Sequence, residues 1–125
     1  MFIINPDKSI FLTRGDIAAI ELSAKTDKST THTFKSGDMV RLNVCEKSRL
    51  DELVIVKDII VDAETPIVTI NLESADTRIG DIIHRPRDYW YEVVLNPETR
   101  PQTLIGYDDD GPKIFRLFPE GGEQQ

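Results

Sequence analysis

The aromatic run Tyr89-Trp90-Tyr91 follows directly on a basic stretch, His84-Arg85-Pro86-Arg87. Successive side chains of a strand point to opposite faces, so one face of this run belongs to the core and the other exposes Trp90 unless something covers it. Tryptophan beside arginine is enriched at the centres of protein interfaces, and such rings also stack on carbohydrates or cations. We therefore expect Arg85, Arg87 and Trp90 to contact a partner. The alternative is that Trp90 packs beneath the arginine loop.

Two further motifs are explained by turn chemistry. Arg14-Gly15-Asp16 spells the tripeptide that integrins bind, but Gly beside Asp between two strands predicts a tight turn. Asp108-Asp109-Asp110 before Gly111 resembles a fragment of a calcium loop. Its acids are consecutive rather than alternating, and the next glutamate, Glu120, lies beyond an apolar strand. We interpret this segment as a solvated acidic turn.

The remaining reactive side chains form no catalytic or metal-binding pattern. His32 and His84 are the two histidines, and neither has a neighbour at metal-ligand spacing. Cys45 is the one cysteine, which excludes an internal disulfide, and we expect it to be a small packed or half-exposed residue. The sequence also lacks a glycine-rich phosphate loop and a paired-carboxylate motif. We expect no enzymatic activity, no cofactor and no metal; a small hydrolase would need a convergent histidine–acid pair in a pocket.

Alternation of apolar and polar residues at period two predicts the elements that position these side chains. The expected strands are 10–13, 17–24, 39–45, 53–61, 66–72, 89–95, 103–107 and 114–118. Leu53–Val61 is apolar on both faces except at Lys57 and Asp58, which predicts a longer, central strand. One short helix is expected near residues 73–79, where Ser74 could cap it and Gly80 could close it. Eight or nine short strands indicate an antiparallel β-sandwich, with an open barrel as the competing architecture.

Length and charge predict the domain organisation and argue against some classes of function. The chain has 125 residues, with 15 Lys and Arg against 22 Asp and Glu, which gives a net charge of −7. This length predicts one domain, expected over residues 1–120, followed by a loose tail at Gly121–Gln125. The acidic balance argues against a nucleic-acid partner, whose binders present a basic face. Every apolar run is too short to span a membrane, and the N-terminus does not predict a signal peptide.

Several of these segments together resemble the N-terminal domain of upper baseplate proteins from phages of Gram-positive bacteria, and small prophage proteins of Firmicutes. The resemblance covers nearly the whole chain, and its strength lies in the order of short motifs. These motifs are Thr13-Arg14-Gly15-Asp16, Gly37-Asp38, Ile70–Thr77, Tyr89–Leu95, Gln102–Ile105 and Lys113–Glu120.

The resemblance implies an immunoglobulin-like β-sandwich that docks within a siphophage tail. In larger relatives the domain seats on the tail tip and a C-terminal region carries the receptor-binding proteins. A chain that ends at Gln125 is expected to dock rather than to recognise a host. It would be made in the bacterial cytoplasm and reside in the virion, and the family supplies no catalytic residues to carry over.

Two functions follow as hypotheses. The first is a non-enzymatic phage or prophage structural protein that binds other tail or baseplate subunits, or a second copy of itself. It would do so by burying an apolar and aromatic patch and by pairing an exposed edge strand. The second is a carbohydrate-binding module in which Trp90 and a tyrosine form the stacking platform.

Overall fold

The computed structural model describes residues 1–23, 33–46, 49–79, 85–107 and 111–120. These residues form an all-β fold, as the period-two alternation predicted, with one short helix. The elements are β1 (Phe2–Ile4), β2 (Ile10–Thr13), β3 (Ala18–Leu22), β4 (Met39–Glu46), β5 (Arg49–Ile60), β6 (Val68–Leu72), α1 (Ser74–Thr77), β7 (Arg87–Leu95), β8 (Gln102–Ile105) and β9 (Lys113–Phe118).

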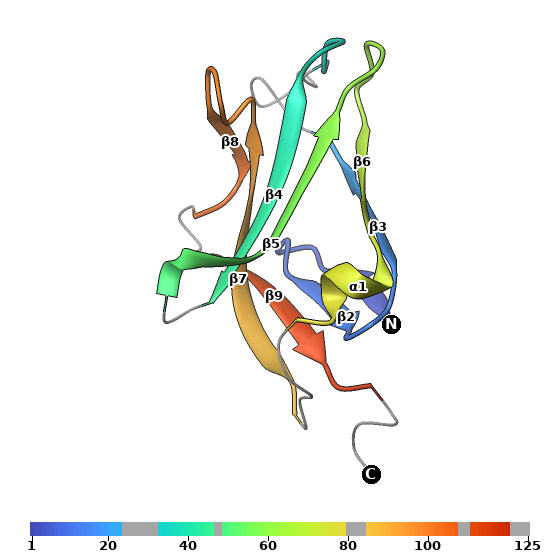
Figure 1. Cartoon of the computed structure of the whole chain (residues 1–125), viewed down its shortest axis with the longest axis vertical. Coiled ribbons are helices and arrows are strands. Elements are labelled where there is room, and N and C mark those ends of the chain that lie inside the picture. The colour runs from blue at the N-terminus through green and yellow to red at the C-terminus, as the bar shows by residue number, and fades with distance from the viewer. Residues whose placement is uncertain (24–32, 47–48, 80–84, 108–110, 121–125) are drawn as a thin grey trace.

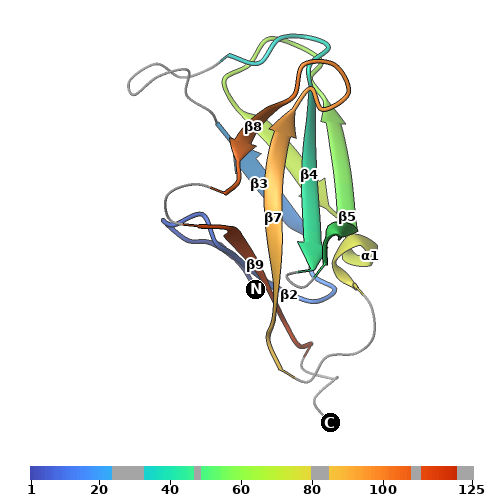
Figure 2. The same ribbon diagram turned by 90° about the vertical axis from the view of Figure 1, so that its left-hand side faces the viewer.

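The strands form two sheets of very different size. The large sheet has seven strands in the order β1-β2-β9-β7-β4-β5, with β8 pairing with β7 off this path. The small sheet is the antiparallel pair β3-β6. Figure 1 shows the small sheet on one side of the long strands β7, β4 and β5, with α1 near the lower end of β6. In Figure 2 the strands β8, β7, β4 and β5 lie side by side and β3 passes behind them.

The core lies between the small sheet and one face of the large sheet. Alternate residues of each strand point into it, which explains the period-two pattern of the sequence. The small sheet contributes Ala18, Ile20, Leu22, Val68, Ile70 and Leu72. The large sheet contributes Ile10, Leu12, Val40, Leu42, Val44, Ile55, Tyr89, Tyr91, Val93, Leu95, Phe115 and Leu117. The described part of the chain is thus a sandwich-like fold with a single shared core.

Three features of the sheets differ from the sequence predictions. β5 stands at the end of the large sheet, so the prediction of a central strand at Leu53–Val61 is wrong. β2 pairs with β9 in parallel, so the sandwich is not purely antiparallel. β1 was not predicted because it has only three residues and their alternation is too short to register. A parallel pairing between strands about a hundred residues apart leaves no local signal in the sequence.

The short helix α1 is hydrogen-bonded to the turn that follows β2. Its N-cap is Glu73 rather than the predicted Ser74, and the Glu73 amide donates to Asp76 Oδ2 at 2.8 Å. The Thr77 hydroxyl donates to the Asp16 carbonyl at 2.9 Å and accepts from the Gly15 amide at 3.0 Å. Gly80, the predicted helix stop, and the predicted tail at 121–125 lie outside the described residues.

The Arg14-Gly15-Asp16 segment is a turn, as its glycine predicted. Gly15 has φ +87°, in the left-handed region that favours glycine. Arg14 is buried, and its Nε donates to the Ile79 carbonyl at 3.4 Å. Asp16 forms an ion pair with the amino group of Met1. Both charged side chains of the tripeptide therefore serve the fold.

Candidate functional site

The large sheet has a second apolar face, turned away from the small sheet. We call it the outer face. The strand registers place the outward-pointing residues in rows across the strands, because side chains of paired residues lie on the same face. Cys45 of β4 lies between Leu53 of β5 and Trp90 of β7, and Trp90 is paired in turn with Ile114 of β9. A band of apolar and aromatic side chains therefore crosses four neighbouring strands.

The apolar residues of β5 on this face are open to solvent. Leu53, Val56 and Ile60 are 47%, 50% and 50% exposed. By contrast, the inward-pointing residues Leu42 and Val44 of the adjoining strand β4 are fully buried. β5 thus has apolar residues on both faces. Those on one face pack in the core, and those on the other lie on the outer face. This pattern is what predicted a central strand.

A hollow of about 210 Å³ lies on the outer face around Trp90. Leu53, Tyr107 and Pro112 contribute apolar and aromatic surface to it, and Asn43 and Glu92 contribute polar groups. Cys45, Tyr91 and Lys113 complete the lining. Tyr107 is 78% exposed. The hollow therefore combines aromatic residues with an amide and a carboxylate.

Two polar atoms of the hollow's lining lack a hydrogen-bond partner within the described residues. They are Asn43 Oδ1 and Trp90 Nε1, and both are buried. The other end of the Asn43 amide is held, because its Nδ2 donates to Glu92 Oε1 at 3.2 Å. Burial, and to a lesser extent the Glu92 carboxylate, raise the pKa of the Cys45 thiol, which keeps it protonated and a poor nucleophile.

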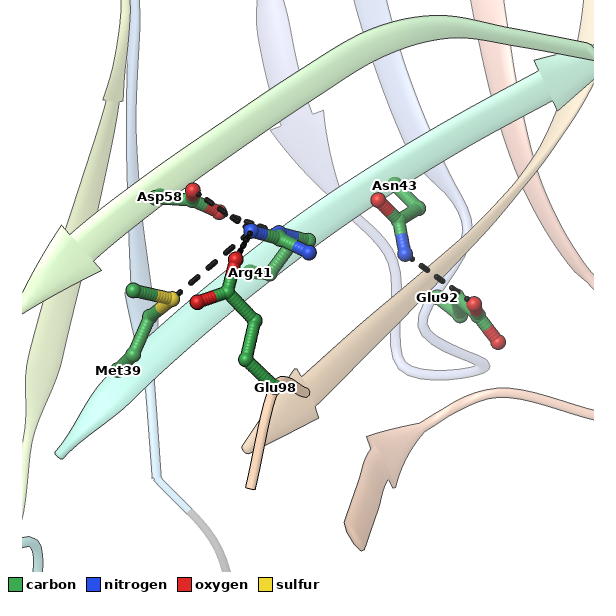
Figure 3. A network of polar contacts seen from close by, with 6 residues as sticks. All are labelled: Met39, Arg41, Asn43, Asp58, Glu92 and Glu98. Atoms are coloured by element: carbon green, nitrogen blue, oxygen red, sulfur yellow. Dashed lines mark hydrogen bonds and ion pairs between the residues drawn. The ribbon is translucent and has the colours of Figure 1, made fainter. Parts of the chain in front are cut away.

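Ion pairs border the apolar band toward both ends of its strands. Figure 3 shows Arg41 of β4 between Asp58 and Glu98, with Nε 2.7 Å from Asp58 Oδ1 and Nη2 3.3 Å from Glu98 Oε1. The hydrogen bond from Arg41 lowers the pKa of Asp58. On the other side of Trp90, Arg116 Nε lies 2.6 Å from Asp88 Oδ1. The outer face thus has an apolar centre and a charged border.

The structure does not bring the three predicted contact residues to one face. The side chains of Arg87 and Trp90 project from opposite faces of β7, because they are three residues apart on a strand. Arg87 pairs with Glu46 at 3.1 Å and lies 5.4 Å from the centre of the Tyr89 ring. Arg85 is exposed just before β7. That either arginine contacts a partner stays a prediction, but Arg87 does not share the face of Trp90.

The structure adds residues to the site that the sequence pattern did not indicate. Arg116, which the alternation of β9 sets opposite Phe115 and Leu117, shares the face of Trp90, as does Arg41 of β4. Tyr107 and Pro112 flank the predicted acidic turn, and nothing in the local pattern connects them to Trp90. The turn itself, Asp108–Asp110, lies outside the described residues, as do His32 and His84.

The described residues hold no group of three side chains that could bind a metal ion. Within the same residues no helix is long and apolar enough to cross a membrane. Comparison of the chain with family models, with curated proteins and with solved structures finds no match.

Proposed function

We propose that this chain is a non-enzymatic structural protein that docks onto another protein subunit through the outer face of its large sheet. One observation carries the proposal. A sheet whose inner face is already buried by β3 and β6 presents Leu53, Val56 and Ile60 to solvent beside Trp90. Leu53 and Val56 are neighbours on this face, and the Arg41–Asp58 ion pair lies between Val56 and Ile60. Exposed apolar residues bordered by polar ones are typical of interaction surfaces.

The composition of the outer face fits a protein partner. Interfaces have apolar and aromatic centres, with charged groups at the rim that fix orientation more than they add affinity. Trp90 lies in the apolar band, whereas Arg41 and Arg116 are held in ion pairs on either side of it. Side chains held in this way lose little further freedom when a partner binds.

The edge of β5 offers a second mode of contact. β5 has twelve residues, and no described strand pairs with its outer edge. An open edge presents unpaired backbone groups to which a strand of a partner can add. Burial of the outer face and strand addition at β5 would engage adjoining surfaces, so one partner could use both.

A phage or prophage tail is the assembly that we propose for this partner. The order of motifs along the chain resembles the N-terminal domain of upper baseplate proteins, and the all-β, sandwich-like architecture is compatible with it. The protein would then be a tail or baseplate subunit of the virion, with an immunoglobulin-like domain.

Light scattering after gel filtration tests the proposal. The chain is measured alone and mixed with each tail protein encoded by the genes beside its own. We expect a complex heavier than the single chain in at least one sample. A mass of one chain in every sample would overturn the proposal.

A further inference from the structure

We propose that the hollow around Trp90 binds a single sugar ring, so that the chain has a saccharide site in addition to its docking surface. The hollow of about 210 Å³ is smaller than the pockets that hold drug-sized ligands, and it suits one ring rather than an extended molecule. It lies beside the exposed row of β5, of which only Leu53 contributes to its lining.

The aromatic side chains supply the surface that a sugar ring needs. A pyranose has an apolar face of C–H groups, and this face packs on the negative face of an aromatic ring. Trp90 and Tyr107 come from different parts of the chain, β7 and the segment after β8, and both line the hollow. Tyr107 is 78% exposed, so its ring is accessible to a ligand.

The polar groups of the hollow match sugar hydroxyls, which both donate and accept hydrogen bonds. Glu92 supplies carboxylate acceptors and is held by the Asn43 amide at 3.2 Å. Asn43 Oδ1 is an acceptor and Trp90 Nε1 a donor, and neither has a partner within the described residues. A buried polar atom without a partner is unfavourable, so the site gains if a small shift on binding lets a hydroxyl reach either atom.

These atoms distinguish a sugar from the other ligands that an aromatic hollow could hold. An apolar side chain of a partner protein would leave Asn43 Oδ1 and Trp90 Nε1 unpaired. A cation stacked on Trp90 could pair with the Glu92 carboxylate, but it offers no acceptor for Trp90 Nε1. A neutral ring bearing hydroxyls satisfies both the aromatic and the polar groups.

Trp90 is the one tryptophan of the chain, so its fluorescence reports directly on the hollow. The probes are individual neutral hexoses and N-acetylhexosamines, titrated to millimolar concentration into the full chain. We expect a saturable change in emission with at least one of them. Tyr107→Ala should weaken that binding about tenfold or more, equivalent to about 1.4 kcal/mol. Tyr107 is exposed, so its truncation should leave the fold intact.

Glu92→Gln and Glu21→Gln form a matched pair of variants. Both glutamates are exposed on strands, but Glu21 lies on the small sheet, away from the hollow. We expect only Glu92→Gln to weaken the sugar titration. The proposal is overturned if no probe gives a saturable change, or if Tyr107→Ala binds as tightly as the unaltered chain. The double variant Val56→Lys with Ile60→Lys alters the docking surface outside the hollow, so its sugar binding separates a failed saccharide site from a failed docking surface.

Discussion

Thr77 connects α1 to the turn between β2 and β3 through one hydroxyl group. The residue is fully buried, and its Oγ1 accepts from the Gly15 amide and donates to the Asp16 carbonyl. These two backbone groups belong to the turn between β2 and β3, where the chain passes from the large sheet to the small one. The hydroxyl therefore holds the crossing between the two layers in place.

Replacing Thr77 by valine should destabilise the protein by about 1–3 kcal/mol, because it keeps the shape but removes the partner of a part-buried amide and a part-buried carbonyl. Thr77→Ser keeps the hydroxyl and serves as the control. Urea unfolding of both variants measures the effect. Equal stability of Thr77→Val and the unaltered chain would contradict this role.

At the scale of elements, β4 and β5 separate the core from the outer face. Leu42 of β4 points inward and is fully buried, whereas Leu53 of β5 points outward and is 47% exposed. Leu42→Ala should cost about 2–5 kcal/mol of unfolding free energy through lost burial and a cavity. Leu53→Ala should cost less than about 1 kcal/mol, as expected for a surface change. Similar losses in urea unfolding would mean that the outer face is covered in the folded monomer.

The contact between β5 and α1 should make stability depend on pH. Lys57 Nζ lies 2.9 Å from Asp76 Oδ2, and this hydrogen bond, with that from the Glu73 amide, lowers the pKa of Asp76 below 3.8. Because the folded pKa is below the unfolded one, the stabilisation is fully present above pH 3.8. It is lost as the pH falls through the lowered folded value.

Asp76→Asn should therefore lower the urea midpoint at pH 7, and its difference from the unaltered chain should shrink below pH 4. Asp62→Asn, at an exposed loop position, is the control and should change little at either pH. A deficit of Asp76→Asn that is the same at pH 7 and pH 3 would show that the charge of Asp76 does not matter.

Most of the strands could be predicted from sequence because their inward faces alternate with period two. β3 and β6 are the clearest examples, with buried residues at every second position. The position of β5 could not be predicted, since apolar residues on both faces indicate a central strand and an edge strand with an uncovered face equally well. The parallel pair β2-β9 and the three residues of β1 depend on contacts distant in sequence.

The candidate site could be predicted only around Trp90. Its outward position follows from the alternation of β7, because Tyr89 and Tyr91 on either side of it pack inward. The same alternation separates Arg87 from Trp90 and puts Arg116 on the Trp90 face, but only once the pairing of β7 with β9 is known. Tyr107 joins the hollow from the segment between β8 and β9, where no periodic pattern indicates a direction.

For the whole molecule, the unequal size of the two sheets explains why the outer face of the large sheet is uncovered. Two strands, β3 and β6, cover the inner face of a seven-stranded sheet, and among the described residues no third layer covers the outer face. A net charge of −7 makes copies of the chain repel one another at long range. The same charge favours a partner with basic groups at the rim of its own surface.

A comparison of two double variants tests the docking face most directly. Val56→Lys with Ile60→Lys changes two outer-face residues, each 50% exposed. Ile17→Lys with Ile67→Lys changes two residues flanking the small sheet that are 70% and 51% exposed, and adds the same charge. Each is measured by light scattering with the tail protein that forms a complex with the unaltered chain. We predict that the first pair abolishes the complex and the second retains it. A complex that still forms with Val56→Lys and Ile60→Lys would contradict docking through the outer face.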